Sequence, residues 1–240
     1  DLSGIQLTLT DGGVATTVYA DSNGEYTFTD VGFEAVVSVQ AVLKGEWVEV
    51  INDAAAGPEL SITANFTQSP LQQLLEFNTN SATCSPPWPG EFDTAQVTAF
   101  LGIQQAHDWF STALSGFSGI DQVVPVTVNR MENNITASYF PGPRMTISRS
   151  GFPSFSPRNK ASFDIVFHEY NHFVQDMIGI LIRIDEFCPD EQGALHCGER
   201  WVELVGGFKE GSSDVTTAFM TGLPCIGYDF IGDGKCDRRT

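Results

Sequence analysis

Two histidines and a glutamate in residues 166–176, VFHEYNHFVQD, have the types and spacing of a metal site. His168 and His172 are four positions apart, so on a helix both imidazoles lie on one face and can reach one tetrahedral metal ion. Glu169 is offset from that face, where its carboxylate can take a proton from a water molecule. The chain has only four histidines, and two of them fall at this offset. The pattern predicts a zinc (Zn2+) site.

A catalytic zinc site needs a third protein ligand and one open position. Residues 206–222, GGFKEGSSDVTTAFMTG, carry Glu210 and Asp214, which are one helical turn apart. Glu210 can supply the third ligand atom, and Asp214 can accept the free N–H of a ligating imidazole and so set its tautomer. The alternative is that both carboxylates are solvated, which leaves zinc without a third protein ligand.

Two helices must hold these groups. Apolar residues at three- and four-residue steps predict a helix over 164–179, which Gly179 can end. A second, mostly buried helix is expected over 206–222. Its apolar residues are Phe208, Val215, Ala218, Phe219 and Met220. The same spacing predicts a helix over 93–114, and strands are expected over 123–130 and on both sides of 141–143.

The first third of the chain has the pattern of a small β-sandwich over residues 1–66. Short β-branched and aromatic runs alternate there with the turn signals DGG, DSNG and KGE. In EYTFTDV, Tyr26 and Phe28 alternate with threonines, as in a strand with one buried face. This module has no His and no Cys, so we expect a stabilising or spacing role for it. Residues 67–91 are irregular and read as a linker.

Charge excludes two classes of partner. The chain has 30 acidic and 12 basic residues, a formal net charge of -18. Such a surface repels nucleic-acid phosphates and anionic membranes, so we expect no nucleic acid as a partner. No apolar run approaches the ~20 residues of a membrane span, so no membrane span is expected.

The cysteines indicate an oxidising compartment. Cys188 and Cys197 flank one short polar loop, and Cys225 and Cys236 flank another, so each pair is a disulfide candidate. The alternative is unpaired, buried thiols. Disulfides persist outside the reducing cytosol, so we expect a secreted or extracellular protein, with the cell surface as one setting. Cys84 is either free or paired outside this chain.

A calcium (Ca2+) site is a further hypothesis. The acidic side chains of residues 228–237 are spaced by four and surround two glycines. They are Asp229, Asp233 and Asp237. Hard oxygen ligands near a tight turn suit calcium, but the pattern matches no full EF-hand loop. A solvated acidic turn is the alternative.

FHEYNHFVQD, followed 38 residues after His172 by Glu210 and Asp214 in EGSSD, resembles the thermolysin- and fungalysin-type zinc metallopeptidases, which are gluzincins. AQVTAFLGIQQAHDWF and ITASYFPGPRMTISRSG are similar to the helix and the substrate-edge strand of that family, so the likeness covers roughly residues 75–222. Residues 7–39 resemble transthyretin-like or carboxypeptidase-regulatory-like modules.

The resemblance implies an α+β fold. A β-sandwich module would precede the strand and active-site helices of a thermolysin-like zincin domain over 92–240, truncated at its C-terminal end. Carried over position by position, the family motif makes His168, His172 and Glu210 zinc ligands. It also makes Glu169 the general base, and it makes Asp214 the carboxylate that contacts the far side of a ligating imidazole.

The implied function is a secreted zinc endopeptidase that hydrolyses peptide bonds by a metal-activated water. The resemblance also implies an edge strand along which a protein or peptide substrate can add as a further strand. Its residues are Thr136, Ala137, Ser138 and Tyr139. The remainder of its own precursor is a second expected partner.

The family pattern continues beyond this chain. Its C-terminal helical subdomain supplies a His or Tyr for the oxyanion, and losing such a donor costs about 100- to 1000-fold in rate. His196 is either a substitute or incidental, and His107 is expected to be a packed or surface helix residue. We expect the chain to be one segment of a longer polypeptide, a processed fragment bound to its remainder, or a degenerate domain. A truncated core of this kind is expected to expose the apolar surface that the missing half covers. The competing hypothesis is an extracellular structural or assembly protein that reuses an incomplete or inactive peptidase fold.

Overall fold

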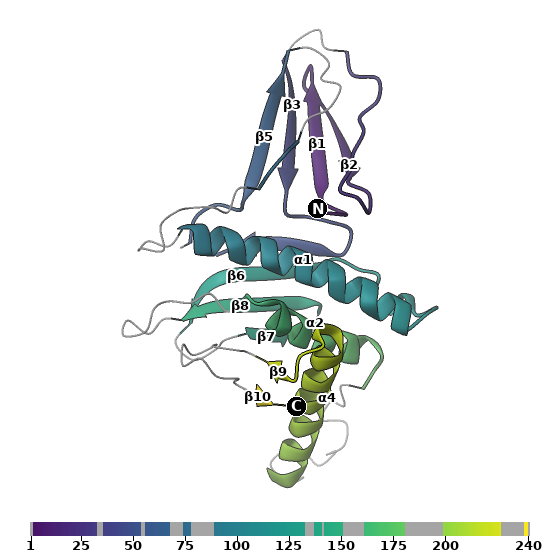
Figure 1. The fold of residues 1–240 in the computed structure, drawn as a ribbon, viewed down its shortest axis with the longest axis vertical. Helices are drawn as coiled ribbons and strands as arrows, with labels where there is room; N and C mark the ends of the chain where they lie inside the picture. The colour runs from purple at the N-terminus through teal and green to yellow at the C-terminus, as the bar shows by residue number, and fades with distance from the viewer. Residues whose placement is uncertain are drawn as a thin grey trace, which may run out of the picture.

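The computed structural model of the chain shows a mixed α and β protein (Figure 1). The residues that it describes are 2–32, 36–53, 56–67, 74–77, 89–132, 137–140, 142–150, 161–180, 199–226 and 238–239. Across these ranges the chain forms two four-stranded sheets, a two-stranded pair and three helices. The general α+β class expected from the sequence is therefore confirmed.

The first sheet is antiparallel, with the strand order β2-β1-β3-β5. Its strands are β1 (Gln6–Asp11), β2 (Val14–Tyr19), β3 (Val37–Val42) and β5 (Ser61–Phe66). In β3, buried positions alternate with more exposed ones, because successive side chains point to opposite faces of a sheet. One face of the sheet therefore packs on the core, as the alternating sequence pattern indicates.

Residues 25–31 differ from their prediction. The alternation in EYTFTDV predicts a strand, but the segment has no ladder partner in the structure. Tyr26 and Phe28 instead form an edge-to-face ring pair with centroids 6.0 Å apart, and both pack against the core from an irregular segment. The alternating pattern therefore marks two rings that are packed against the core from an irregular segment, and not a strand.

The second sheet has the order β4-β6-β8-β7. Its strands are β4 (Val48–Asn52), β6 (Val124–Glu132), β8 (Arg144–Ser150) and β7 (Ala137–Phe140). The first three are parallel, and β7 is the antiparallel edge strand. The strands predicted after residue 122 are confirmed. However, β4 lies within residues 1–66 and pairs with β6, so a boundary at residue 66 does not separate the two sheets.

The helices are α1 (Pro89–Ala113), α2 (Phe163–Met177) and α4 (Glu199–Thr221). In Figure 1 the first sheet stands above α1, and the second sheet lies below it, with α2 and α4 beyond. The helix α1 contacts β4 and β6, whereas α2 contacts β7, β8 and both other helices. The edge strand β7 therefore lies beside the helix that carries the histidines.

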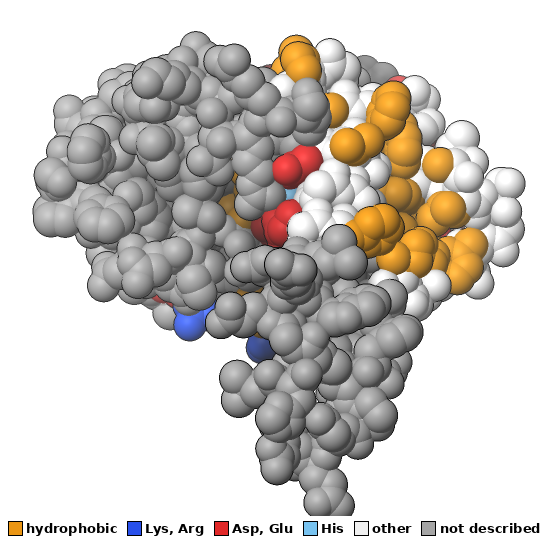
Figure 2. Space-filling view, turned by 90° about the horizontal axis from the view of Figure 1, so that it is seen from below, with side chains coloured by type: hydrophobic (Ala, Val, Ile, Leu, Met, Phe, Trp, Pro, Cys, Tyr) orange, Lys and Arg blue, Asp and Glu red, His pale blue; other side chains and the backbone are white. Residues whose placement is uncertain are grey.

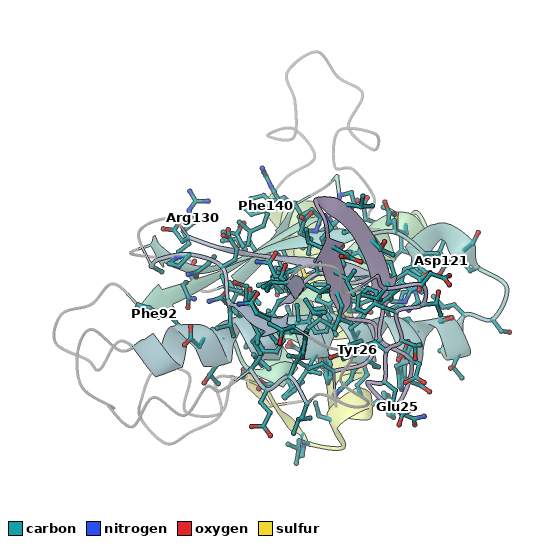
Figure 3. All side chains as sticks on the ribbon, turned by 90° about the horizontal axis from the view of Figure 1, so that it is seen from above. Glu25, Tyr26, Phe92, Asp121, Arg130 and Phe140 are labelled. Carbon is teal, nitrogen blue, oxygen red and sulfur yellow. The ribbon has the colours of Figure 1, made fainter. Side chains whose placement is uncertain are left out.

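One buried apolar cluster joins these layers. It contains residues of the first sheet such as Leu7 and Val39, residues of the second sheet such as Val50 and Val126, and Phe100 of α1. Figure 3 shows the described side chains as sticks on the ribbon, seen from above Figure 1. The elements that carry the site are thus anchored on a shared core.

Smaller elements complete the described fold. They are the 3-10 helix η1 (Ser118–Ile120) and the paired strands β9 (Cys225–Ile226) and β10 (Arg238–Arg239). Among the described residues, no helix has the length and apolar character needed to cross a membrane.

Gly102 lets α1 approach α2 closely. A Cβ atom at this position would lie 2.7 Å from Cγ1 of Val166, which is fully buried. Alanine gains about 1 kcal/mol in helix propensity, but the branched valine cannot turn away, and overpacking costs about 1–3 kcal/mol. We expect Gly102→Ala to lower the free energy of unfolding by about 1 kcal/mol in urea titrations. Gly207→Ala, in open space on α4, is the matched control and should not destabilise.

Candidate metal centre

The helix α2 is buried on every side along its central turns. All side chains from Ile165 to Gln175 are buried, including the polar ones. The helix ends where the sequence predicts, because Gly179 adopts a φ of 74°, in the left-handed region that favours glycine. A helix this deeply buried holds its polar side chains in fixed positions. Each of them therefore needs a partner.

The partners come from α4. His168 lies three and four residues before Asn171 and His172, and these two lie four and three residues before Gln175, so all four side chains share one face of α2. Residues at the same steps on α4 lie opposite this face. The side chains of α4 that contact α2 include those of Glu210, Ser212, Ser213 and Asp214. The interface between the two helices is therefore polar.

The orientation of α4 corrects a prediction. The apolar residues of 206–222 predict a mostly buried helix, but Phe208, Val215 and Phe219 are 59%, 48% and 77% exposed. Figure 2, seen from below Figure 1, shows apolar side chains gathered on this face of the molecule, near acidic groups. Because α2 presents hydrogen-bonding side chains, the polar face of α4 turns inward and its apolar side is left outside.

Three ligand atoms meet between the helices. Within the described part of the chain, His168, His172 and Glu210 form a group that can hold a metal ion. The two Nε2 atoms are 3.1 Å apart, and the Glu210 oxygens lie 3.2 Å from Nε2 of His168 and 3.4 Å from Nε2 of His172. In a tetrahedral zinc site with bonds of about 2.0–2.1 Å, ligand atoms are about 3.3 Å apart. The spacing therefore fits zinc.

Asp214 lies behind His168, as its position one turn after Glu210 predicts. Its Oδ1 atom is 2.9 Å from Nδ1 of His168. The separation is short, although the ring N–H is not aimed along it, so the contact is chiefly electrostatic. A carboxylate here favours a proton on Nδ1, which leaves Nε2 free for a metal.

The residues that orient His172 were missed by the sequence prediction. Its Nδ1 atom lies 3.2 Å from Oγ of Ser213 and 3.4 Å from Oε1 of Gln175. When Nε2 binds a metal, Nδ1 carries the proton and can donate it to either oxygen. Asn171 and Gln175 also donate to Ser213 Oγ, which holds that hydroxyl in place. The available signal was the three-residue spacing between His172 and Gln175.

We expect Ser213→Ala to weaken zinc binding by about 10- to 100-fold, the usual effect of removing an outer partner of a metal ligand. Competition with a chromophoric chelator measures the dissociation constant. Ser212→Ala is the matched control, because this neighbouring hydroxyl contacts Gln175 and the Lys209 carbonyl but not His172. Equal zinc affinities for the two variants would show that Ser213 does not orient the ligand.

Burial and neighbouring charges shift two pKa values at the site. Burial raises the pKa of Glu169, and the imidazoles of His168 and His172 oppose the shift. Burial lowers the pKa of His168, but the interactions with Asp214 and Glu210 and the charge of Glu169 outweigh it and raise this pKa to about 9. The metal-free site thus holds a proton on His168 at neutral pH.

Zinc binding at pH 7 is expected to release about one proton from His168, since the metal needs a neutral imidazole and the pKa of this one is about 9. Apparent zinc affinity should rise with pH up to about pH 9 and then level off. Calorimetry at pH 7 in two non-coordinating buffers of different ionisation enthalpy counts the released proton. Identical binding enthalpies in both buffers would contradict this expectation.

The other predicted residues fall into two groups. Ala137, Ser138 and Tyr139 lie in the edge strand β7, and His107 is a packed helix residue, stacked on Trp47 with ring centroids 4.0 Å apart. The rest lie outside the described residues, and Cys225 is described only by its backbone in β9. They are Thr136, Cys84, Cys188, Cys197, Cys236, His196, Asp229, Asp233 and Asp237.

Comparisons with protein-family models, with curated proteins and with solved structures find no match to this chain. The resemblance to gluzincins stays a prediction, and the function proposed below depends on the residues of the site and their geometry.

Proposed function

We propose that this protein is a zinc-dependent peptidase. The observation that carries the proposal is the set of three ligand atoms from His168, His172 and Glu210, which are spaced as in a tetrahedral zinc site. Glu169 follows the first ligand directly in α2, and its carboxylate is buried beside the two imidazoles. Three ligands plus an adjacent base are the composition of a hydrolytic site.

Each residue of the site has its own role in the proposed hydrolysis. A bound zinc ion supplies Lewis acidity, which acidifies water and polarises a carbonyl group. Glu169 takes the proton of the attacking water and returns it to the leaving amine. Burial supports this role, because a raised pKa makes the Glu169 carboxylate a stronger proton acceptor. Asp214 and Ser213 keep the two imidazoles in the tautomer that binds a metal.

A purely structural zinc site is supported less well. Structural sites are closed by four protein ligands and need no base. Here the described residues supply three ligand atoms, and the Glu210 side chain is 48% exposed. Figure 2 shows acidic side chains beside a histidine on this face of the molecule. One side of the site therefore reaches solvent, where a substrate can approach.

A peptide is the substrate class that the neighbouring strand favours. The edge strand β7 contacts α2, the helix that carries His168 and Glu169. Its outer side is not paired with another described strand. An extended peptide can pair with such an edge through main-chain hydrogen bonds, which places its own carbonyl groups along the site.

The proposal is tested with a fluorogenic casein substrate and the full chain. Protein stripped of metal by a chelator should not cleave it, and one equivalent of zinc should restore cleavage. Zinc-loaded protein that binds the ion tightly but cleaves neither casein nor a library of unfolded peptides would contradict a peptidase. An assembly role, the second candidate, is favoured by the exposed apolar side of α4 and would then be the better account.

A further inference from the structure

Gln175 lies on the face of α2 that meets α4, and the residue is only 4% exposed. Its amide nitrogen Nε2 lies within hydrogen-bond distance of three oxygens of one turn of α4. They are the Lys209 carbonyl at 3.2 Å, Ser212 Oγ at 2.9 Å and Ser213 Oγ at 3.1 Å. An amide nitrogen carries two protons, so one proton is shared between two of these oxygens. The turn that Gln175 contacts contains Glu210, which directly follows Lys209.

The oxygen of the same amide faces the second histidine of the site. Oε1 of Gln175 lies 3.4 Å from Nδ1 of His172. Gln175 therefore lies between an imidazole of the metal centre and the turn that carries the carboxylate. Ser213 Oγ is closer to the same Nδ1 atom, at 3.2 Å, and can accept its proton without Gln175. The larger contribution of Gln175 is therefore the contact of its nitrogen with α4.

Of the three side chains that can bind the metal, that of Glu210 is held least by burial. It is 48% exposed, whereas those of His168 and His172 are 5% and 11% exposed. A glutamate that is exposed keeps more of its rotamer freedom, so the place of its carboxylate depends on where the helix backbone is held. Its oxygens nevertheless lie 3.2 and 3.4 Å from the two Nε2 atoms. The backbone of α4 must therefore be fixed close to the histidines.

We propose that Gln175 is a positioning residue for Glu210, the third ligand of the proposed zinc site. Its Nε2 atom fixes the turn of residues 209–213 against α2, the helix that carries both histidines. The Glu210 carboxylate is thus brought to the imidazoles before a metal binds. Ordering a ligand in advance lowers the entropy cost of binding and so raises the affinity. This inference rests on the zinc site of the proposed function, but it does not require that the site cleaves peptides.

The test compares two variants that each lose one buried amide. Gln175→Met keeps the length of the side chain and removes both polar atoms. Gln104→Met is the matched control, because Gln104 of α1 is also buried and donates to a main-chain carbonyl, that of Ser3, at the same distance of 3.2 Å. Both variants lose a buried hydrogen bond to a carbonyl oxygen, so both are expected to lower the free energy of unfolding. The control shows what a loss of stability alone does to zinc binding.

The first readout is zinc affinity, measured by competition with chromophoric chelators. Gln175→Met should weaken binding by about 10- to 100-fold, as the loss of an outer partner of a metal ligand does, and Gln104→Met should bind as the wild type does. In a Glu210→Ala background, Gln175→Met should weaken binding by less than about 3-fold, because a residue that acts through a ligand loses its effect when that ligand is absent. Unchanged affinity in the wild-type background, or an equal loss in both backgrounds, would overturn the proposal.

The second readout is amide hydrogen exchange of the metal-free protein, followed by NMR. In Gln175→Met the amides of residues 210–213 should exchange at least about 10-fold faster than in the wild type, whereas those of α1 keep their rates. Unchanged rates at 210–213, or an equal increase in every helix, would overturn the proposal even in a chain that binds no zinc. Neither readout uses a substrate. Protein that binds zinc but cleaves nothing would contradict the peptidase and leave the role of Gln175 standing.

Discussion

Glu169→Gln is expected to lower kcat for peptide hydrolysis by about 100- to 10,000-fold, the range that a general acid–base group contributes. Glutamine has the same shape but cannot accept the proton of the attacking water. Zinc should stay bound at one ion per chain, because the ligand atoms come from His168, His172 and Glu210. Stopped-time assays on a peptide substrate, with metal analysis of the same samples, measure both quantities.

Glu59→Gln is the matched control for this change. Glu59 is exposed and lies outside the site, so the variant loses the same charge without losing the base. It should cleave at the wild-type rate. A Glu169→Gln protein that cleaves as fast as Glu59→Gln would show that Glu169 is not the base, even if zinc is bound as proposed.

Glu210→Ala is expected to weaken zinc binding by more than about 100-fold, beyond the 10- to 100-fold effect of losing an outer partner. The variant removes one of three protein ligands and leaves the ion with two imidazoles. Asp214→Asn should fall within the smaller range, because Asp214 acts through His168. Chelator competition ranks the two variants. A reversed order, or unchanged affinity in Glu210→Ala, would place the third ligand elsewhere.

The parts of the fold that the sequence predicts well are local. The periodicity of α2 and the glycine that ends it lie within one stretch of chain, as do the runs that form β6 and β8. The location of β4 is a different problem. Its residues read as a strand, but whether it pairs with β3 or with β6 depends on a partner some 75 positions away, and no local pattern encodes that choice.

The residues of the site also fall into those that local spacing predicts and those that depend on the packing of distant elements. The spacing of His168 and His172 is readable because a helix brings i and i+4 together, and Glu210 follows from the need for a third ligand. Ser213 is a neutral side chain that carries no such signal, and for Gln175 the only local signal is its position three residues after His172. The inward-facing side of α4 could not be predicted from its own sequence either. A row of apolar residues ordinarily marks the buried face of a helix, but α4 packs against the polar side chains of α2, so its polar face is buried instead.

The central claim is that His168, His172 and Glu210 hold a zinc ion with one position open. X-ray absorption at the zinc edge, on protein loaded with one equivalent of zinc, tests it most directly. The account predicts about four nitrogen or oxygen neighbours at about 2.0–2.1 Å, two of them with the outer-shell pattern of imidazole. A sulfur shell at about 2.3 Å would instead place zinc on cysteines and contradict the account.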